Sequence, residues 1–324
     1  MSSWSLLLPY DIRNYISSYL DQNNSYYPVI NYKKYLIKYV AIKNDINNDI
    51  KYLKNLQILD CGSNTNFTDE RLKHLTNLQE LYCRNNKNFT DEGLKHLTNL
   101  QVLDCNKNFT DEGLKHLTNL QHLNCRYNIN FTDEGLKQLT NLQKLNCWKN
   151  TKFTDEGLKH LINLKEFYIW GGNNFTDKGI KNLINLKKLY CCDNINFTDK
   201  GIKNLTNLQI LYCGSNINFT DEGIKHLTNL HELNCGCNKN FTDKGIIHLS
   251  NLQVLGCGYN INFTDKGLSQ LINLRELYCT CNINFTDEVL DHLTKLQILY
   301  CNSINKFTAK KIKQLTNLKF KTFI

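Results

Sequence analysis

The sequence is poor in proline and methionine, with two and one among 324 residues, whereas Asn, Lys, Ile and Tyr are abundant. This bias is typical of an AT-rich coding genome and carries no information about activity. No apolar stretch approaches the roughly 20 residues that a membrane-spanning helix needs. A secretory signal is also missing at the start, because Met1 to Tyr10 has no basic segment and the apolar run from Trp4 to Leu8 is too short. These absences predict an intracellular, cytoplasmic protein.

The sequence also lacks the motifs of an active site. It contains no phosphate-binding loop and no recognisable nucleophile motif, and its charged residues (21%, net charge +9) form no long block of one sign. A catalytic histidine would be singular and paired with a nucleophile or a carboxylate. Instead, seven of the nine histidines recur at one position of a repeat: His74, His96, His116, His160, His226, His248 and His292. We therefore expect no enzymatic activity and no cofactor.

An internal repeat is the dominant feature of the sequence. A unit of the form L-Q-x-L-x-C-x-x-N-x-N-F-T-D-E-G-L-K-H-L-T-N recurs from Leu56 to Leu318, and its Phe returns every 22 residues except in one repeat. That repeat, Leu100 to Asn119, has lost two residues in the turn after Cys105. We number the positions of each repeat from its first Leu.

The pattern inside each repeat predicts a strand followed by a short helix. L-x-x-L-x-C alternates as a strand does, and the later Leu residues lie three apart as in a helical turn. A Thr-Asp pair supplies the cap of the helix, and Asn at position nine is expected to form a ladder that satisfies buried backbone groups. A strand, a turn and a short helix every 22 residues is the pattern of a leucine-rich repeat. About twelve such repeats would bury one continuous core.

Gly at position 16 precedes the first apolar residue of the predicted helix, except at Arg71, Val289 and Lys311, which lie near the ends of the repeat array. If a positive φ were the reason for this Gly, every repeat would need it, including those near the ends. The pattern therefore indicates a close approach between neighbouring helices, which is relaxed near the ends.

Eleven cysteines share the inward-facing position six, and Ile169 takes the twelfth place: Cys61, Cys83, Cys105, Cys125, Cys147, Cys191, Cys213, Cys235, Cys257, Cys279 and Cys301. Because Ile is accepted there, we interpret the column as reduced, packed thiols and not as metal ligands. In Cys235-Gly-Cys237 and Cys279-Thr-Cys281 only the first Cys faces inward, so neither pair can converge on one zinc ion. The sequence predicts no metal site.

The string L-x-x-L-x-C-x-x-N-x-x-F-T-D-x-G-L-x-x-L resembles the cysteine-containing class of leucine-rich repeats, which is typical of F-box proteins. It departs from that class in carrying Asn at position nine and Cys at position six, and its repeats are shorter. The resemblance implies an α/β solenoid: a leucine-rich-repeat horseshoe with a parallel concave sheet, short convex helices and a small helical N-terminal cap. It also implies that this chain is related to substrate receptors of cullin-type ubiquitin ligases.

The first 45 residues do not repeat, and we divide the chain into a cap over residues 1–45 and a repeat domain over residues 46–324. The start resembles an F-box, whose helix contacts the ligase adaptor. The residues that resemble it are Leu8, Pro9, Asp11, Ile12, Ile16 and Leu20. The second half departs from the F-box pattern, since the usual basic residue followed by Trp is missing. A plain helical cap that covers the open end of the core is the alternative.

The variable positions three, five, seven and eight point away from the core, onto the concave face, and they hold large aromatic and basic residues. Tyr, Trp and Arg dominate binding hot spots. We predict as partner-binding residues Tyr82, Arg84, Arg126, Tyr127, Trp148, Tyr168, Trp170, Tyr190, Tyr212, Tyr278 and Tyr300. The predicted centre of this patch comprises Arg126, Tyr127, Trp148, Tyr168 and Trp170.

These features predict a protein–protein interaction scaffold that binds a protein partner on its concave face, as a substrate receptor of a cullin-type ubiquitin ligase if the F-box interpretation holds. Nucleic-acid or anionic-surface binding through the basic, aromatic-rich face is the alternative. Its binding would weaken steeply with salt.

Overall fold

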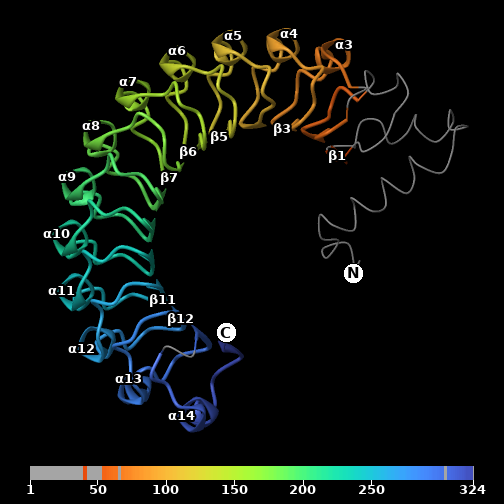
Figure 1. Ribbon diagram of the computed structural model, residues 1–324. Helices are drawn as coiled ribbons and strands as arrows, with labels where there is room; N and C mark the ends of the chain where they lie inside the picture. The colour runs from red at the N-terminus through yellow and green to blue at the C-terminus, as the bar shows by residue number, and fades with distance from the viewer. Residues whose placement is uncertain (1–38, 42–52, 65–66, 303–304, 324) are drawn as a thin grey trace, which may run out of the picture. The chain divides into compact units, whose positions relative to one another are not determined.

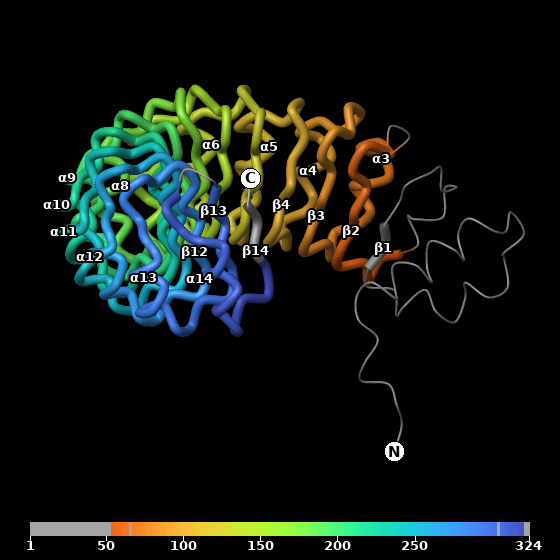
Figure 2. The backbone as a smooth tube through the Cα atoms, turned by 60° about the horizontal axis from the view of Figure 1, so that its bottom comes forward, coloured from red at the N-terminus to blue at the C-terminus, as the bar shows by residue number. Residues whose placement is uncertain are grey.

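The computed structural model describes residues 39–41, 53–64, 67–302 and 305–323. The chain divides into two compact units, an N-terminal unit (Met1–Lys152) and a C-terminal unit (Phe153–Ile324). Within each unit the repeats follow one another as successive coils, with the strands on the inner side and the helices on the outer side (Figures 1 and 2).

In the N-terminal unit the strands pair in parallel and in chain order, and equivalent residues of the repeats stand opposite each other, as Leu59 does to Leu81. Its elements are β1 (Tyr39–Ala41), β2 (Ile58–Asp60), α3 (Asp69–Leu72), β3 (Glu80–Tyr82), α4 (Asp91–Leu94), β4 (Val102–Asp104), α5 (Asp111–Leu114), β5 (His122–Asn124), α6 (Asp133–Leu136) and β6 (Lys144–Asn146).

The C-terminal unit repeats the same arrangement and ends with two longer helices, α13 and α14, of six residues each. Its elements are α7 (Asp155–Leu158), β7 (Glu166–Tyr168), α8 (Asp177–Ile180), β8 (Lys188–Tyr190), α9 (Asp199–Ile202), β9 (Ile210–Tyr212), α10 (Asp221–Ile224), β10 (Glu232–Asn234), α11 (Asp243–Ile246), β11 (Val254–Gly256), α12 (Asp265–Leu268), β12 (Glu276–Tyr278), α13 (Asp287–His292), β13 (Ile298–Cys301), α14 (Ala309–Gln314) and β14 (Phe320–Phe323).

The core lies between the strands and the helices and is built from the columns of the repeat. The Leu at positions one and four from Leu56 to Leu299, the eleven cysteines and Ile169 are all buried, as the sequence predicts. The Phe of each repeat, which the sequence analysis used only to mark the period, is also buried. Neighbouring rings contact each other, as Phe67 and Phe89 do edge to face with centroids 5.7 Å apart. The fold class predicted from the repeat, a parallel sheet with short helices on its outer side, is confirmed.

The asparagine at position nine forms the predicted ladder. Asn128 donates from its side-chain amide to the carbonyl oxygens of Asn106 and Phe109 in the preceding repeat, both at 3.0 Å. Its Oδ1 accepts from the backbone N–H groups of Asn130 and Phe131, at 2.8 and 3.2 Å. One side chain thus satisfies four backbone groups of a buried turn.

Two further asparagine ladders run along the surface, and the sequence analysis did not identify them. The Asn that closes each repeat donates to a carbonyl of the preceding repeat, as Asn119 does to Thr98 at 3.0 Å. The Asn before the Phe does the same, as Asn130 does to Lys107 at 2.8 Å. Because most repeats are tied to their predecessors at three turns, the strands keep one register along each unit.

The Thr-Asp pair before each helix acts partly within its repeat and partly between repeats. The hydroxyl of Thr110 accepts from the N–H of Glu112 at 3.4 Å, which is the predicted helix cap. The carboxylate of Asp91, in the preceding repeat, accepts from the Thr110 N–H at 2.9 Å and from its hydroxyl at 2.6 Å. The Asp therefore links two helices instead of capping its own.

The sheet begins earlier than the division at residue 46 suggests, because β1 lies at Tyr39–Ala41 and pairs with β2. The remainder of the expected cap over residues 1–45 lies outside the described residues. So do all six residues of the F-box-like motif, from Leu8 to Leu20.

Candidate partner-binding surface

The predicted partner-binding residues lie on the sheet face opposite the core or in the turn that follows each strand. Tyr82, Tyr168, Tyr190, Tyr212 and Tyr278 end their strands, and the residue before each of them is a buried core residue. The alternation of the strand therefore turns every one of these tyrosines away from the core. The predicted centre of the patch divides between the two units, since Arg126, Tyr127 and Trp148 belong to the N-terminal unit and Tyr168 and Trp170 to the C-terminal unit.

In the C-terminal unit, three tyrosines on β7, β8 and β9 form a stack that we name the tyrosine row: Tyr168, Tyr190 and Tyr212. The rings of Tyr168 and Tyr190 are nearly parallel, with centroids 4.4 Å apart and an interplanar angle of 10°. Tyr190 and Tyr212 follow at 4.7 Å with a 31° tilt. In-register parallel strands bring equivalent side chains about 4.8 Å apart, so the row follows directly from Tyr at position five in three consecutive repeats.

Carboxylates hold the hydroxyl ends of the row. Tyr168 donates to Glu166 at 2.9 Å, Tyr212 donates to Glu232, and Glu166 also pairs with Lys188 at 2.7 Å. Burial first, and then the hydrogen bonds to these carboxylates, raise the pKa of Tyr168 and Tyr212 above the usual range. Both hydroxyls therefore remain protonated, and the row is an oriented aromatic surface with little rotamer freedom to lose on binding.

The tyrosine row ends after β9 because the next two repeats carry Asn234 and Gly256 at position five. The Asn234 side chain extends over Gly256, where a Cβ would lie 2.9 Å from the Asn234 Cγ. A second aromatic pair, Tyr278 and Tyr300, follows with centroids 6.2 Å apart. Tyr278 donates to Glu276 at 2.9 Å.

Trp170 lies in an unusual turn of the C-terminal unit and is 46% exposed. Its repeat has Gly172, with φ of 84°, at position nine, where most repeats carry the ladder Asn. The asparagine is displaced by one position to Asn173, whose amide donates to the Trp170 carbonyl at 2.9 Å. This altered turn sets Trp170 apart from the equivalent residues of its neighbours.

In the N-terminal unit, three cations surround two aromatic rings in a group that we name the basic cluster: Lys107, Arg126, Tyr127, Trp148 and Lys149. The guanidinium carbon of Arg126 lies 4.1 Å from the centre of the Trp148 ring system and 5.5 Å from that of Tyr127. The ammonium groups of Lys107 and Lys149 lie 5.5 and 5.8 Å from the Tyr127 ring. The rings of Tyr127 and Trp148 are 5.1 Å apart.

Backbone geometry explains how the cluster assembles. Tyr127 and Lys149 occupy position eight with φ of 62° and 61°, the left-handed conformation that turns the chain after each strand. The shortened repeat lacks a residue at this position, so Lys107 is the side chain that reaches the Tyr127 ring from that repeat. Sequence reasoning found Arg126, Tyr127 and Trp148 but missed both lysines. The two-residue deletion was the signal that could have indicated Lys107.

Two more predicted residues lie beside the basic cluster in the same unit. Arg84 pairs with Asp104, with 3.1 Å between Nη2 and Oδ2. Tyr82 donates to Glu80 at 2.7 Å. Burial raises the pKa of Asp104, against the lowering effect of Arg84 and of Arg126. Asp104 therefore offsets part of the positive charge of the two arginines.

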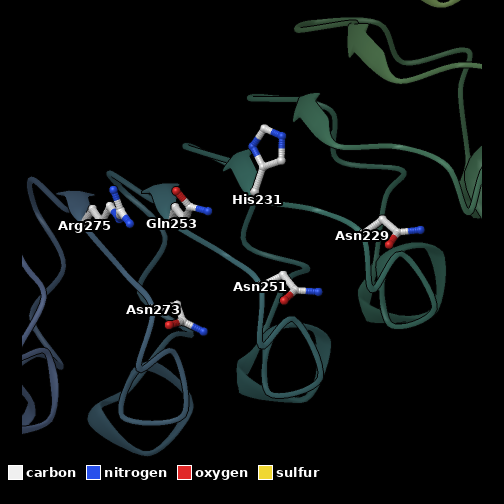
Figure 3. A pocket seen from close by; sticks show the side chains of 6 residues that line it. All are labelled: Asn229, His231, Asn251, Gln253, Asn273 and Arg275. Atoms are coloured by element: carbon white, nitrogen blue, oxygen red, sulfur yellow. The ribbon is translucent and has the colours of Figure 1, made fainter.

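A polar pocket of about 380 Å³ opens where the strands of three consecutive repeats begin in the C-terminal unit (Figure 3). It is lined by Asn229, His231, Asn251, Gln253, Asn273 and Arg275. Its asparagines belong to the ladder that closes each repeat, as Asn251 shows by donating to Thr228 at 3.0 Å. The lining contains neither a carboxylate nor a nucleophile, so the pocket offers no acid–base pair for catalysis.

The cysteine column is structural. Burial raises the pKa of its thiols, strongly for Cys83 and Cys213 and to about 11 for Cys301, so they remain protonated at neutral pH. Cys235 is buried while Cys237 is exposed, because Cys237 lies in the left-handed turn after the strand, with φ of 62°. Within the described residues, no group of three or more His, Cys, Asp and Glu side chains could hold a metal ion.

Comparison with known proteins supports the same fold. A family model described as a leucine-rich repeat region matches residues 32–178. No curated protein sequence gives a significant match. Of the helices in the described part of the chain, none has the length and apolar character needed to cross a membrane.

Several solved structures are similar. An internalin from Listeria monocytogenes is 25% identical with a TM-score of 0.70, over 95% of this chain and 93% of that one. The functional domain of InlJ from Listeria monocytogenes, which includes a cysteine ladder, is 27% identical with a TM-score of 0.64, over 84% of this chain and 60% of that one. Rad7 in the yeast Rad7–Elc1 complex shares the fold alone, at 18% identity and a TM-score of 0.54, over 86% of this chain and 83% of that one. The chain thus has the leucine-rich-repeat fold.

Proposed function

We propose that this chain is a non-enzymatic scaffold that binds a protein partner on the concave faces of its units. Leucine-rich-repeat folds generally mediate protein–protein interaction, and the fold by itself names no partner. The observation that supports a binding role for this sheet is the tyrosine row. It presents three stacked rings, and Glu166 and Glu232 fix the hydroxyls of the outer two, Tyr168 and Tyr212.

The chemistry of the row favours a protein partner. Tyrosine combines a large apolar ring with a polar end, and it is enriched at the centres of protein interfaces. Trp170 adds an exposed indole in the same unit, and Tyr127 adds a ring that is 39% exposed in the N-terminal unit. None of these side chains belongs to the buried core, so their removal leaves the Leu, Phe and Cys columns intact.

Substitution of the row tests this proposal. Tyr190→Ala together with Trp170→Ala should abolish capture of the partner purified from native cells. The free energy of unfolding should fall by only about 1–2 kcal/mol, because the side chains are partly exposed. Ile184→Ala is the matched control, since Ile184 is an apolar residue of the same unit that is 57% exposed and lies outside the concave face. Capture that survives the double substitution would rule out this surface.

For the N-terminal segment we propose the narrower role of a ubiquitin-ligase substrate receptor inside the cell. Its support is the F-box-like pattern from Leu8 to Leu20, together with the likeness of the repeat fold to Rad7, whose structure was solved in complex with Elc1. The test compares the full chain with a Leu8→Ala, Ile12→Ala variant in a pull-down against the ligase adaptor. Adaptor binding that requires both residues supports the role, and no binding by the wild-type chain leaves a stand-alone scaffold.

A further inference from the structure

The basic cluster gathers positive charge that no carboxylate pairs with. In the part of the chain that the structure describes, Lys107, Arg126 and Lys149 form no salt bridge, and their contacts are with the rings of Tyr127 and Trp148. On the convex side of the same unit, lysines are paired with a glutamate three residues before them, as Lys137 is with Glu134 at 2.6 Å. Within the described residues, the concave turn therefore holds three cations that form no salt bridge, although Asp104 offsets part of the charge of Arg126.

Arg126 is held in a geometry that suits a carboxylate. Its guanidinium carbon lies 4.1 Å from the centre of the Trp148 ring system, so the group is held against this ring. It makes no hydrogen bond to another described residue, and its Nε is buried. A planar guanidinium that is already oriented loses less freedom when it binds a carboxylate through two parallel hydrogen bonds.

The surroundings favour a short anionic segment over a nucleic-acid strand. Base stacking needs an open aromatic face, but cations lie over the Tyr127 and Trp148 rings. The strands β2 and β3 of the same unit carry Asp60 and Glu80 on the face opposite the core. These carboxylates would repel a phosphate backbone that continued along the sheet.

We infer that the basic cluster binds a short segment of the protein partner rich in Asp and Glu. This inference rests on the proposed function and specifies the chemistry of the partner at one site. Arg126 forms the bidentate contact with one carboxylate, and Lys107 and Lys149 contact carboxylates on either side. Charge complementarity of this kind raises the association rate and orients the partner over the rest of the surface.

The experiment measures fluorescence anisotropy of a labelled oligoglutamate peptide with the full chain. An oligoglutamine of equal length and an oligothymidylate serve as comparison probes. Oligoglutamate should bind best, and its affinity should fall with added salt. Arg126→Gln should weaken binding about tenfold, because it removes the bidentate contact. Lys149→Gln should weaken binding about threefold, because it removes a single charged contact with a flanking carboxylate. Lys137→Gln, which removes the same charge from the convex side, should have no effect.

Three outcomes would overturn the inference: equal binding of oligoglutamate and oligoglutamine, tighter binding of oligothymidylate, or equal losses from Lys137→Gln and Lys149→Gln. Tyr190→Ala separates the inference from the proposed function. It should impair capture of the protein partner while leaving oligoglutamate binding unchanged. If the partner is still captured by the Arg126→Gln chain at wild-type affinity, the acidic-segment inference alone fails.

Discussion

Gly135 lies directly against Asp111 of the preceding helix. A Cβ at Gly135 would stand 2.4 Å from the Asp111 Oδ1, the same carboxylate whose oxygens accept from the Thr132 N–H and hydroxyl at 2.9 and 2.6 Å. The glycine of the repeat is therefore set by a close approach between helices and not by a positive backbone angle, as the sequence predicts.

Gly135→Ala should destabilise the protein although Ala is the better helix former by about 1 kcal/mol. The methyl group must displace the Asp111 carboxylate from its two hydrogen bonds to Thr132, so we expect a net loss of about 2 kcal/mol. Urea unfolding measures the change. Gly62→Ala is the matched control, because its nearest neighbours would be 3.5 Å from the new Cβ. A stabilised Gly135→Ala chain would contradict the explanation.

Asn128→Ala should cost about 3 kcal/mol or more, because it leaves two carbonyl and two N–H groups of a buried turn without their partner. Asn130→Ala removes one exposed hydrogen bond to the Lys107 carbonyl and should cost less than about 1 kcal/mol. Thermal and urea unfolding of the two variants give the comparison. Equal costs would show that the position-nine ladder has no special role.

Stability should fall steeply as the solution becomes alkaline. In the unfolded chain a thiol ionises near pH 8.5, whereas burial raises the pKa of the folded thiols of the column. The folded state then holds more protons, so stability is complete below about pH 8.5 and declines above it. The expected decline is about 1.4 kcal/mol per thiol for each pH unit.

Cys213→Ala tests this pH dependence. The free energy of unfolding is measured in urea at several pH values. In the variant it should decline less steeply at alkaline pH, by the contribution of one thiol. An apolar residue is accepted in this column, as the buried Ile169 shows. If the wild-type and variant slopes are identical, ionisation of the buried thiols is not what limits stability at high pH.

The repeat made most of the fold predictable from the sequence, because each position of the repeat has the same structural role in many copies. Leu59 and Cys61 are buried and Asn128 forms the ladder because every repeat repeats the same turn. Predictions were weaker where one repeat departs from the others. Asn173 lies one position late, and its amide donates to Trp170 of its own repeat and not to the preceding repeat. The strand β1 lies before residue 46.

The sequence predicted which residues lie on the candidate surface, but it did not predict which side chains contact each other there. Alternation in the strand placed Tyr190 outward, yet the carboxylate that fixes Tyr212 comes from the next strand, at Glu232. Lys149 reaches the Tyr127 ring from a left-handed turn position. A repeat consensus carries no signal for such pairings, because each depends on side chains that occur in only one or two repeats.

Hydroxyl-radical footprinting of the complex with its native partner tests the central claim most directly, since it reports side-chain exposure residue by residue. We expect partner binding to protect Tyr190, Trp170 and Tyr127 from oxidation, while the convex His160 and His226 keep the reactivity of the free chain. Protection of the convex histidines with unchanged oxidation of the concave tyrosines and Trp170 would contradict it.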